Sequence, residues 1–205
     1  MIAAMWSGGK DSCLAVWRFV EAGGKVDRLI CMLNENRSRA HGLNRDIVAR
    51  QAEAIGIEVV FGSSTLDYGK VLKEIIEELG TRKVIFGDIF LEEHRRWIEE
   101  FCSKIGVQPI FPLWGDDTLN LAEEFVSVGF EAYVVAVRKD VDVNILGKKF
   151  DEELIKTLVS AGIDPCGENG EFHTLVVNGP LFRKKVEFKF GKVWENEKYL
   201  LLNIS

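Results

Sequence analysis

The first residues that could do chemistry are Ser7, Gly8, Gly9, Lys10, Asp11 and Ser12. An apolar run over residues 1–6 precedes them and suits a buried strand, and apolar residues then repeat at helical spacing from Cys13 to Val20. The glycines allow close backbone approach, so consecutive N–H groups can point into one concavity at the start of a helix, where the helix dipole favours anions. Two hydroxyls and the Lys10 ammonium add donors. The segment therefore predicts an anion-binding turn, and Asp11 fits beside it if it holds Mg²⁺, orients Lys10 or caps the helix.

This turn is not a Walker loop, which requires a glycine, four residues, Gly-Lys and then Ser or Thr. The position five before Gly9 is Ala4, and Asp11 follows Lys10. The hexapeptide instead resembles the PP-loop, S-G-G-x-D-S, of the N-type ATP pyrophosphatases. That resemblance implies cleavage of ATP between the α and β phosphates, with the pyrophosphate held by the loop. The competing interpretation is a plain glycine turn with a capping serine.

Composition narrows the class of protein. The 205 residues carry a net charge of −6, which argues against general nucleic-acid binding. The four cysteines share no C-x-x-C spacing, so we expect neither a disulfide framework nor a zinc site. We also expect no signal peptide and no membrane span, and hence a cytoplasmic protein.

The pattern along the chain alternates between short apolar runs and helical periodicity. Five such units predict an α/β fold with a doubly wound, parallel five-stranded sheet in a domain of residues 1–128. A smaller α+β lobe is predicted for residues 129–205, ending in a hairpin that turns at Gly191-Lys192. The expected strands of the sheet are residues 1–6, 29–33, 57–61, 83–86 and 107–111, and those of the lobe are 130–137, 174–177, 185–190 and 193–202.

Open parallel sheets bind ligands at the carboxyl ends of their strands, which directs attention to three loops. The second strand ends beside the first turn, so the backbone near Met32 to Asn34 is expected to receive adenine. A polar loop with His41-Gly42 follows. Gly87 and Asp88 end the fourth strand, where Asp88 could hold Mg²⁺, a ribose or an incoming amine, or could cap the next helix.

A second polar group lies in the lobe, at residues 167–174, G-E-N-G-E-F-H-T. Glu168, Asn169, Glu171, His173 and Thr174 crowd a glycine-broken loop before a strand. Such an arrangement is typical of side chains aimed at a small polar ligand. A loop without function is the other interpretation.

Taken in order, four segments resemble the diphthine-ammonia ligase family across nearly the whole chain. They are the S-G-G-K-D-S turn, His41-Gly42, P-L-W-G at residues 112–115 and G-E-N-G-E-F-H-T. The resemblance implies an adenine nucleotide alpha hydrolase-like (HUP) fold and an ATP-dependent ligase. Such an enzyme forms diphthamide from diphthine, a modified histidine on elongation factor 2, with ammonium as nitrogen donor. The chain departs from the family after the fourth strand, where G-D-I-F-L stands in place of a small-residue motif such as G-A-I-A-S.

The resemblance also implies roles for the residues. Lys10, the loop amides and the two serine hydroxyls would stabilise charge on the phosphates, and Asp11 would bind Mg²⁺. Glu168, Asn169 and Glu171 would position the acceptor or ammonium, and His173 or His41 would move a proton. Three alternatives stay open: RNA thiolation, another acceptor, and a nucleotide-binding module without catalysis. The apolar tail hairpin could also serve an interface between copies.

Overall fold

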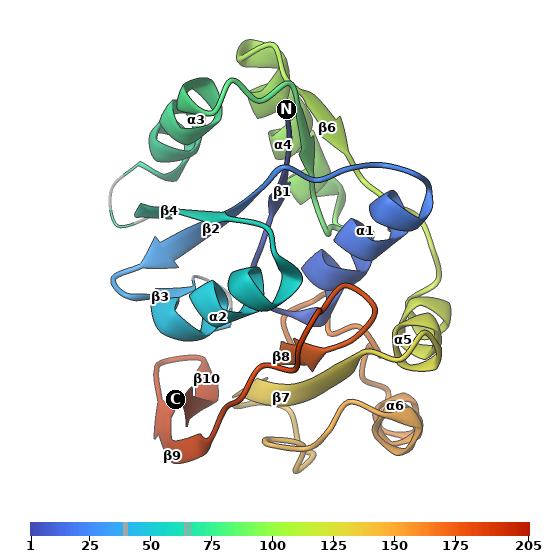
Figure 1. Cartoon of the computed structure of the whole chain (residues 1–205). Helices are drawn as coiled ribbons and strands as arrows, with labels where there is room; N and C mark the ends of the chain where they lie inside the picture. The colour runs from blue at the N-terminus through green and yellow to red at the C-terminus, as the bar shows by residue number, and fades with distance from the viewer. Residues whose placement is uncertain (39–40, 64, 66) are drawn as a thin grey trace.

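The computed structural model describes residues 1–38, 41–63, 65 and 67–205. Its larger sheet contains five parallel strands, ordered β4, β2, β1, β5 and β6 (Figure 1). In chain order of the parallel strands this is third, second, first, fourth and fifth, so the order reverses between β1 and β5, as in doubly wound folds. The predicted parallel five-stranded sheet is confirmed. The five strands are β1 (Ile2–Met5), β2 (Arg28–Asn34), β4 (Val59–Ser63), β5 (Lys83–Ile85) and β6 (Gln108–Ile110).

One short strand was not predicted. β3 (Arg37–Ser38) pairs antiparallel with the end of β2, which makes the sheet mixed. Glu35 in the intervening turn has a φ of 55°, a left-handed conformation that apolar periodicity does not reveal.

Alternate residues of the buried strands face opposite sides of the sheet, as the two-residue repeat of a strand requires. Ala4 and Leu29 belong to one apolar cluster with the helices α1 (Lys10–Glu21) and α2 (Arg45–Ile55). Ala3 and Ile30 belong to a second cluster with α3 (Tyr68–Glu78) and α4 (Glu92–Lys104). Helices therefore cover both faces, and this burial explains why the strands read as continuous apolar runs.

Side-chain caps fix where several helices begin. Asn44 accepts from the Ile47 N–H at 2.9 Å at the start of α2, a common role for asparagine at this position. Asp117 accepts from the Asn120 N–H at 3.0 Å at the start of α5 (Thr118–Ser127). α2 ends at Gly56, whose φ of 82° is the left-handed conformation expected of a glycine cap.

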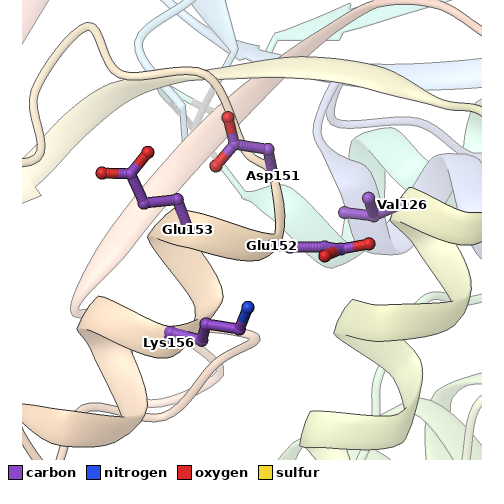
Figure 2. Close-up of a pocket in the computed structure, with 5 residues that line it drawn as sticks. All are labelled: Val126, Asp151, Glu152, Glu153 and Lys156. Atoms are coloured by element: carbon purple, nitrogen blue, oxygen red, sulfur yellow. The ribbon is translucent and has the colours of Figure 1, made fainter.

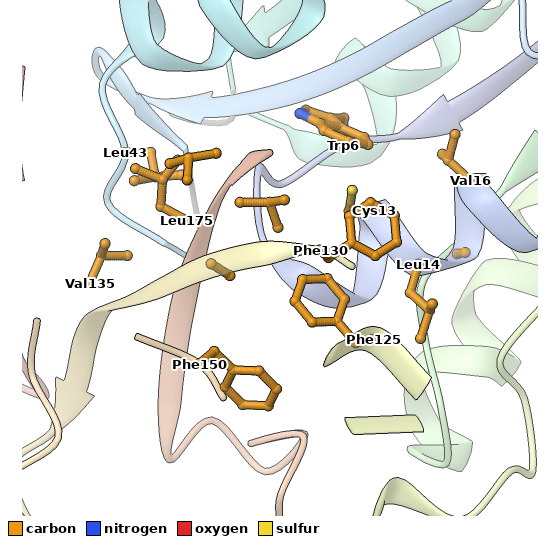
Figure 3. Close-up of a cluster of buried hydrophobic side chains, with 14 of the residues drawn as sticks. Trp6, Cys13, Leu14, Val16, Leu43, Phe125, Phe130, Val135, Phe150 and Leu175 are labelled. Carbon is orange, nitrogen blue, oxygen red and sulfur yellow. The ribbon is translucent and has the colours of Figure 1, made fainter. Parts of the chain in front are cut away.

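The second sheet is antiparallel, in the order β8, β7, β10 and β9, and packs on the α1 and α2 side of the first (Figure 1). The apolar cluster of that side continues into it through Phe125, Phe130, Val135, Phe150 and Leu175 (Figure 3). One core thus joins both sheets. The elements are β7 (Glu131–Arg138), α6 (Glu152–Ser160), β8 (Phe172–Asn178), β9 (Phe190–Glu195) and β10 (Tyr199–Ile204).

The predicted turn of the tail hairpin is wrong. Gly191 and Lys192 lie inside β9, and the chain reverses after Asn196 instead. The Asn196 side-chain oxygen accepts from the N–H groups of Lys198 at 2.9 Å and Tyr199 at 2.7 Å. An asparagine that binds the backbone ahead of it makes a turn without glycine, so the glycine was the misleading signal.

Among the described residues, no helix is long and apolar enough to cross a membrane.

Candidate functional site

The S-G-G-K-D-S turn lies where the strand order of the first sheet reverses. It connects β1 to α1, and the end of β5 packs directly against it. A Cβ placed on Gly87 would lie 2.9 Å from the Ser12 backbone nitrogen and 3.0 Å from the Asp11 carbonyl carbon. Only a glycine permits this approach, so Gly87 brings the loop after β5 to the start of α1.

Hydroxyl groups order the turn from within. The Ser7 and Ser12 Oγ atoms lie 3.1 Å apart, and the Ser12 hydroxyl donates to the Gly9 carbonyl at 3.1 Å. The Gly9 N–H donates to the Ser7 hydroxyl at 3.3 Å. Gly8 has a φ of +85°, which is strained for any other residue. The glycines and serines therefore fix the backbone of the turn, and the hydroxyls of both serines line the same side.

The edge strand of the second sheet closes over the turn. The Val176 N–H donates to the Gly8 carbonyl at 3.0 Å, and the Lys10 N–H donates to the Thr174 hydroxyl at 3.0 Å. Thr174 thus satisfies one of the free N–H groups at the start of α1. This contact joins the two polar segments of the sequence, which are 164 residues apart at this bond.

Gln51 also connects the turn to β8 by hydrogen bonds, a role that the sequence did not reveal. The residue is fully buried on α2, and its amide donates to the carbonyls of Gly8 at 2.9 Å and Val176 at 2.6 Å. Its oxygen accepts from the Trp6 indole N–H at 3.1 Å. Gln51 stands on the apolar face of the helical pattern, and a glutamine at such a position was the available signal.

Lys10 and Asp11 form an ion pair under the turn. The Lys10 Nζ donates to both Asp11 carboxylate oxygens, at 2.7 and 2.8 Å, and to the Cys166 carbonyl. It also lies over the rings of Phe150 and Phe172, at 5.8 and 5.5 Å from their centroids. Burial disfavours the charged lysine, but the Asp11 carboxylate overcomes this and holds the pKa of Lys10 above its usual value. Of the three roles predicted for Asp11, the structure shows one: its carboxylate orients the Lys10 side chain.

Two of the predicted residues form a histidine pair, in which His41 is buried and His173 is half-buried. The rings of His41 and His173 have centroids 4.7 Å apart, and the His173 ring also lies 5.2 Å from that of Tyr199. His41 Nδ1 donates to the Thr174 carbonyl at 2.8 Å, which places its proton on that nitrogen. Burial, together with the nearby Lys10 charge, lowers the pKa of His41 to about 4 and that of His173 well below its usual value. Both rings are therefore neutral at neutral pH.

Acidic side chains form another wall. Glu168 Oε1 accepts from the Ile89 N–H at 2.9 Å, which ties the lobe to the loop after β5. Burial raises the pKa of Glu168 to about 7, and the Asp11 charge contributes in the same direction. Burial also raises the pKa of Asp88, although His94 lies 3.4 Å away. Asp88 does not cap α4, whose N-cap is Leu91 without a side-chain bond.

These groups line a cavity of about 1270 Å³. Twelve of the predicted site residues line it: Ser7, Lys10, Asp11, Ser12, Met32, His41, Gly87, Asp88, Glu168, Asn169, His173 and Thr174. Apolar and aromatic side chains from the first sheet and its helices add a further wall, comprising Met5, Tyr68, Phe86, Leu91, Trp97 and Ile98. The cavity therefore combines a phosphate-type turn, an apolar wall and a polar wall from the second sheet.

Three predicted residues do not line the cavity. Gly8 and Gly9 are buried in the turn, and a Cβ on Gly9 would lie 2.1 Å from His41 Cε1. Glu171, within residues 167–174, is buried. Its Oε1 accepts from the Asn169 side chain at 3.3 Å, and its Oε2 has no hydrogen-bond partner among the described residues. Gly9 thus makes room for His41, and Glu171 holds Asn169.

A smaller hollow of about 450 Å³ lies at the start of α6, next to α5 (Figure 2). Asp151, Glu152, Glu153 and Lys156 line it with Val126. Asp151 caps α6 by accepting from the Leu154 N–H at 3.0 Å. The hollow contains none of the predicted site residues, and its acids serve the helix.

Fold and site together define an α/β protein with a PP-loop at the switch point of its sheet. Comparison with known proteins narrows this class. The model of the diphthamide synthase N-terminal domain matches residues 1–109, and that of the diphthamide synthase C-terminal domain matches residues 117–204. The chain belongs to the diphthamide synthase family, and the resemblance stated from the sequence is confirmed.

The curated relatives that match the chain are named diphthine–ammonia ligases. The chain is 27% identical to a diphthine–ammonia ligase of Danio rerio, over 90% of this chain and 85% of the relative. It is 27% identical to that of Homo sapiens, over 90% and 81%. It is 28% identical to that of Schizosaccharomyces pombe, over 95% of this chain and 37% of the much longer relative. A solved structure described as a predicted subunit of tRNA methyltransferase from Methanocaldococcus jannaschii overlays with a TM-score of 0.46 at 15% identity, over 90% of this chain and 98% of that one.

Proposed function

We propose that this protein is an ATP-dependent amide-forming ligase that converts diphthine to diphthamide with ammonium as nitrogen donor. The observation that carries the proposal is the bond from the Lys10 N–H to the Thr174 hydroxyl, which joins the PP-loop and the lobe segment in one cavity. The names of the curated relatives support the same reaction. An ATP-activating loop and an acceptor loop that share one cavity are what a ligase needs.

In this proposal, the turn receives the triphosphate. The two serine hydroxyls and the positive start of α1 favour its charge. The incoming phosphates compete with Asp11 for the Lys10 ammonium, which the cation–aromatic contacts keep beneath the turn. The apolar wall around Met32, at the end of β2, receives adenine. Residues 1–128 thus hold the nucleotide, and residues 129–205 hold the acceptor.

The proposed reaction has two steps. A carboxylate oxygen of the acceptor attacks the α phosphorus of ATP, the bond to the β phosphate breaks, and pyrophosphate leaves into the turn. Ammonia then attacks the acyl carbon of the resulting acyl adenylate, a C–N bond forms, and AMP leaves with the electron pair of the broken C–O bond. Donors fixed in advance around the departing pyrophosphate lower the barrier, and losing one typically costs about 3 kcal/mol.

Mg²⁺ fits this site only as an ion carried by the nucleotide. Within the described part of the chain, no group of three or more His, Cys, Asp or Glu side chains could hold a metal by itself. Mg²⁺ typically binds through one or two carboxylates and substrate phosphates, and keeps several waters. Asp11, at the cavity wall, is the proposed protein ligand, and the ion would neutralise phosphate charge.

The acceptor in this proposal is diphthine on elongation factor 2. A cavity of about 1270 Å³ holds more than a nucleotide alone, and its polar wall from residues 167–174 suits the polar groups of the acceptor. RNA thiolation receives no support, because Cys13, Cys31, Cys102 and Cys166 are all buried. Burial also raises the pKa of each thiol, so none is a ready nucleophile.

The test is incubation with ATP, Mg²⁺, ammonium and diphthine-bearing elongation factor 2. We expect AMP and pyrophosphate to form in step with amidated acceptor. Lys10→Met should abolish turnover, whereas Lys192→Met, on exposed β9, should not change it. Formation of ADP, or AMP release that does not depend on ammonium, would contradict the proposal.

A further inference from the structure

We propose that the Glu168 carboxylate is the general base that takes a proton from ammonium before nitrogen attacks the acyl adenylate. This inference rests on the proposed ligase function and adds an assignment for one of its steps. Ammonium has no free electron pair, so an amide-forming site must remove a proton at the point of attack. The structure favours one side chain for that task.

Glu168 is held in place through both its backbone and its side chain. Its N–H donates to Asp164 Oδ2 at 2.7 Å, and its Oε1 accepts from the Ile89 N–H at 2.9 Å. The other carboxylate oxygen, Oε2, makes no hydrogen bond to any residue that the structure describes, and the side chain lines the cavity. One oxygen is thus a fixed anchor, and the other is available to a ligand.

The charges around Glu168 suit a small cation. Asp11 and Asp88 face it from α1 and from the loop after β5, and Lys10 is the cation among the groups that act on it. Because Lys10 is already paired with Asp11, the remaining carboxylates leave an excess of negative charge. Such a wall attracts ammonium to the side of the cavity where residues 167–174 lie.

Electrostatics also suit proton transfer there. Burial and the Asp11 charge raise the pKa of Glu168 to about 7, so both protonation states are populated at neutral pH. General bases work best when their pKa lies near the operating pH. Among the described residues, the carboxylate of Glu168 accepts from the Ile89 N–H and not from Lys10, so it takes no part in the Lys10–Asp11 pair.

The histidines, which the sequence offered as proton carriers, are worse placed. His41 uses Nδ1 on the Thr174 carbonyl, and its pKa of about 4 makes its other nitrogen a weak base. The pKa of His173 is also far below its usual value, for the same reason of burial. Neutral rings can shape the cavity or donate hydrogen bonds, but they hold a proton poorly at neutral pH.

In the step itself, ammonium gives one proton to Glu168 and becomes ammonia. The freed electron pair forms the C–N bond to the acyl carbon, and the C–O bond to AMP breaks with its electrons leaving on the AMP phosphate. The nitrogen then loses a second proton to solvent, which leaves the amide. Glu168 returns its proton to solvent before the next turnover.

The experiment compares Glu168→Gln with wild type in two half reactions. With ATP, Mg²⁺ and acceptor, exchange of labelled pyrophosphate into ATP reports adenylation and should change less than threefold. Ammonium-dependent amide formation should fall by about 100-fold or more, which is the usual contribution of a general base. Hydroxylamine, which is a far weaker base than ammonia and is unprotonated at neutral pH, should restore turnover as hydroxamate in the variant. Glu153→Gln, on the exposed side of α6, is the matched control.

Each outcome decides a different point. If the wild-type protein shows neither pyrophosphate exchange nor AMP formation, the proposed ligase function is wrong, and this inference fails with it. Wild-type activity with ammonium in Glu168→Gln would overturn the assignment of the base alone. Loss of both the ammonium and the hydroxylamine reactions would also overturn it, because the residue would then bind acceptor. If Glu168→Gln does not fold, Glu168→Asp must keep pyrophosphate exchange and a reduced, measurable ammonium rate, and equal loss of both would again overturn it.

Discussion

Replacing Gln51 with leucine should loosen the junction between the PP-loop and the second sheet. Leucine fills a similar volume in the core but leaves the Trp6 indole N–H and the Val176 carbonyl without their Gln51 partner. The Gly8 carbonyl keeps its bond from the Val176 N–H. Each buried polar group left without a partner costs about 1–3 kcal/mol, so two such groups predict a loss of roughly 2–6 kcal/mol in the free energy of unfolding.

The assay is urea unfolding, followed at equilibrium by Trp fluorescence and circular dichroism. The exposed glutamine on β6 supplies the control: Gln108→Leu should stay within about 0.5 kcal/mol of wild type. A cost below about 1 kcal/mol for Gln51→Leu, at an unchanged urea slope, would show that the junction does not depend on this amide.

Gln51→Glu sharpens the same test through pH. A glutamate there would place an oxygen against the two carbonyls that now accept from the Gln51 amide, so the folded protein must hold it protonated. Its pKa in the folded state would then exceed the unfolded value of about 4.3. The folded form binds the extra proton, so stability relative to wild type should be best near pH 4 and fall as pH rises. An unfolding free-energy difference that does not vary with pH would refute this reasoning.

Three further predictions concern the walls of the cavity. Because burial lowers the pKa of His41 from an unfolded value near 6.5 to about 4, stability should fall by up to about 3 kcal/mol as pH drops through that interval; in urea unfolding at a series of pH values, His41→Asn should reduce this pH dependence of the unfolding free energy. Gly9→Ala should cost about 1–3 kcal/mol in urea unfolding, because its Cβ would overlap His41, and a second change of His41→Ala should recover part of that loss. Gly87→Ala should weaken ATP binding, measured by calorimetry, because its Cβ would press on the backbone at Ser12; unchanged affinity would contradict the packing argument.

Local patterns were sufficient for the regular elements. Burial on both faces makes the parallel strands continuous apolar runs, and a helical face repeats every three or four residues, so both can be read within a short window. For the same reason the turn at Ser7 was predictable, since its partners lie within a few residues. Strand β3 and the turn at Asn196 were missed because two residues of strand and an asparagine turn leave little periodic signal.

The sequence by itself determined a PP-loop at the end of the first strand and a second polar segment at residues 167–174, because residue types at close spacing carry that information. Only the tertiary structure decided that β8 closes over the turn, that Gln51 locks the two, and that Lys10 lies under the turn in a pair with Asp11. It likewise decided that Glu168, and neither His41 nor His173, has its pKa near neutrality. Those properties depend on burial and on partners up to 164 residues away, which no local pattern records.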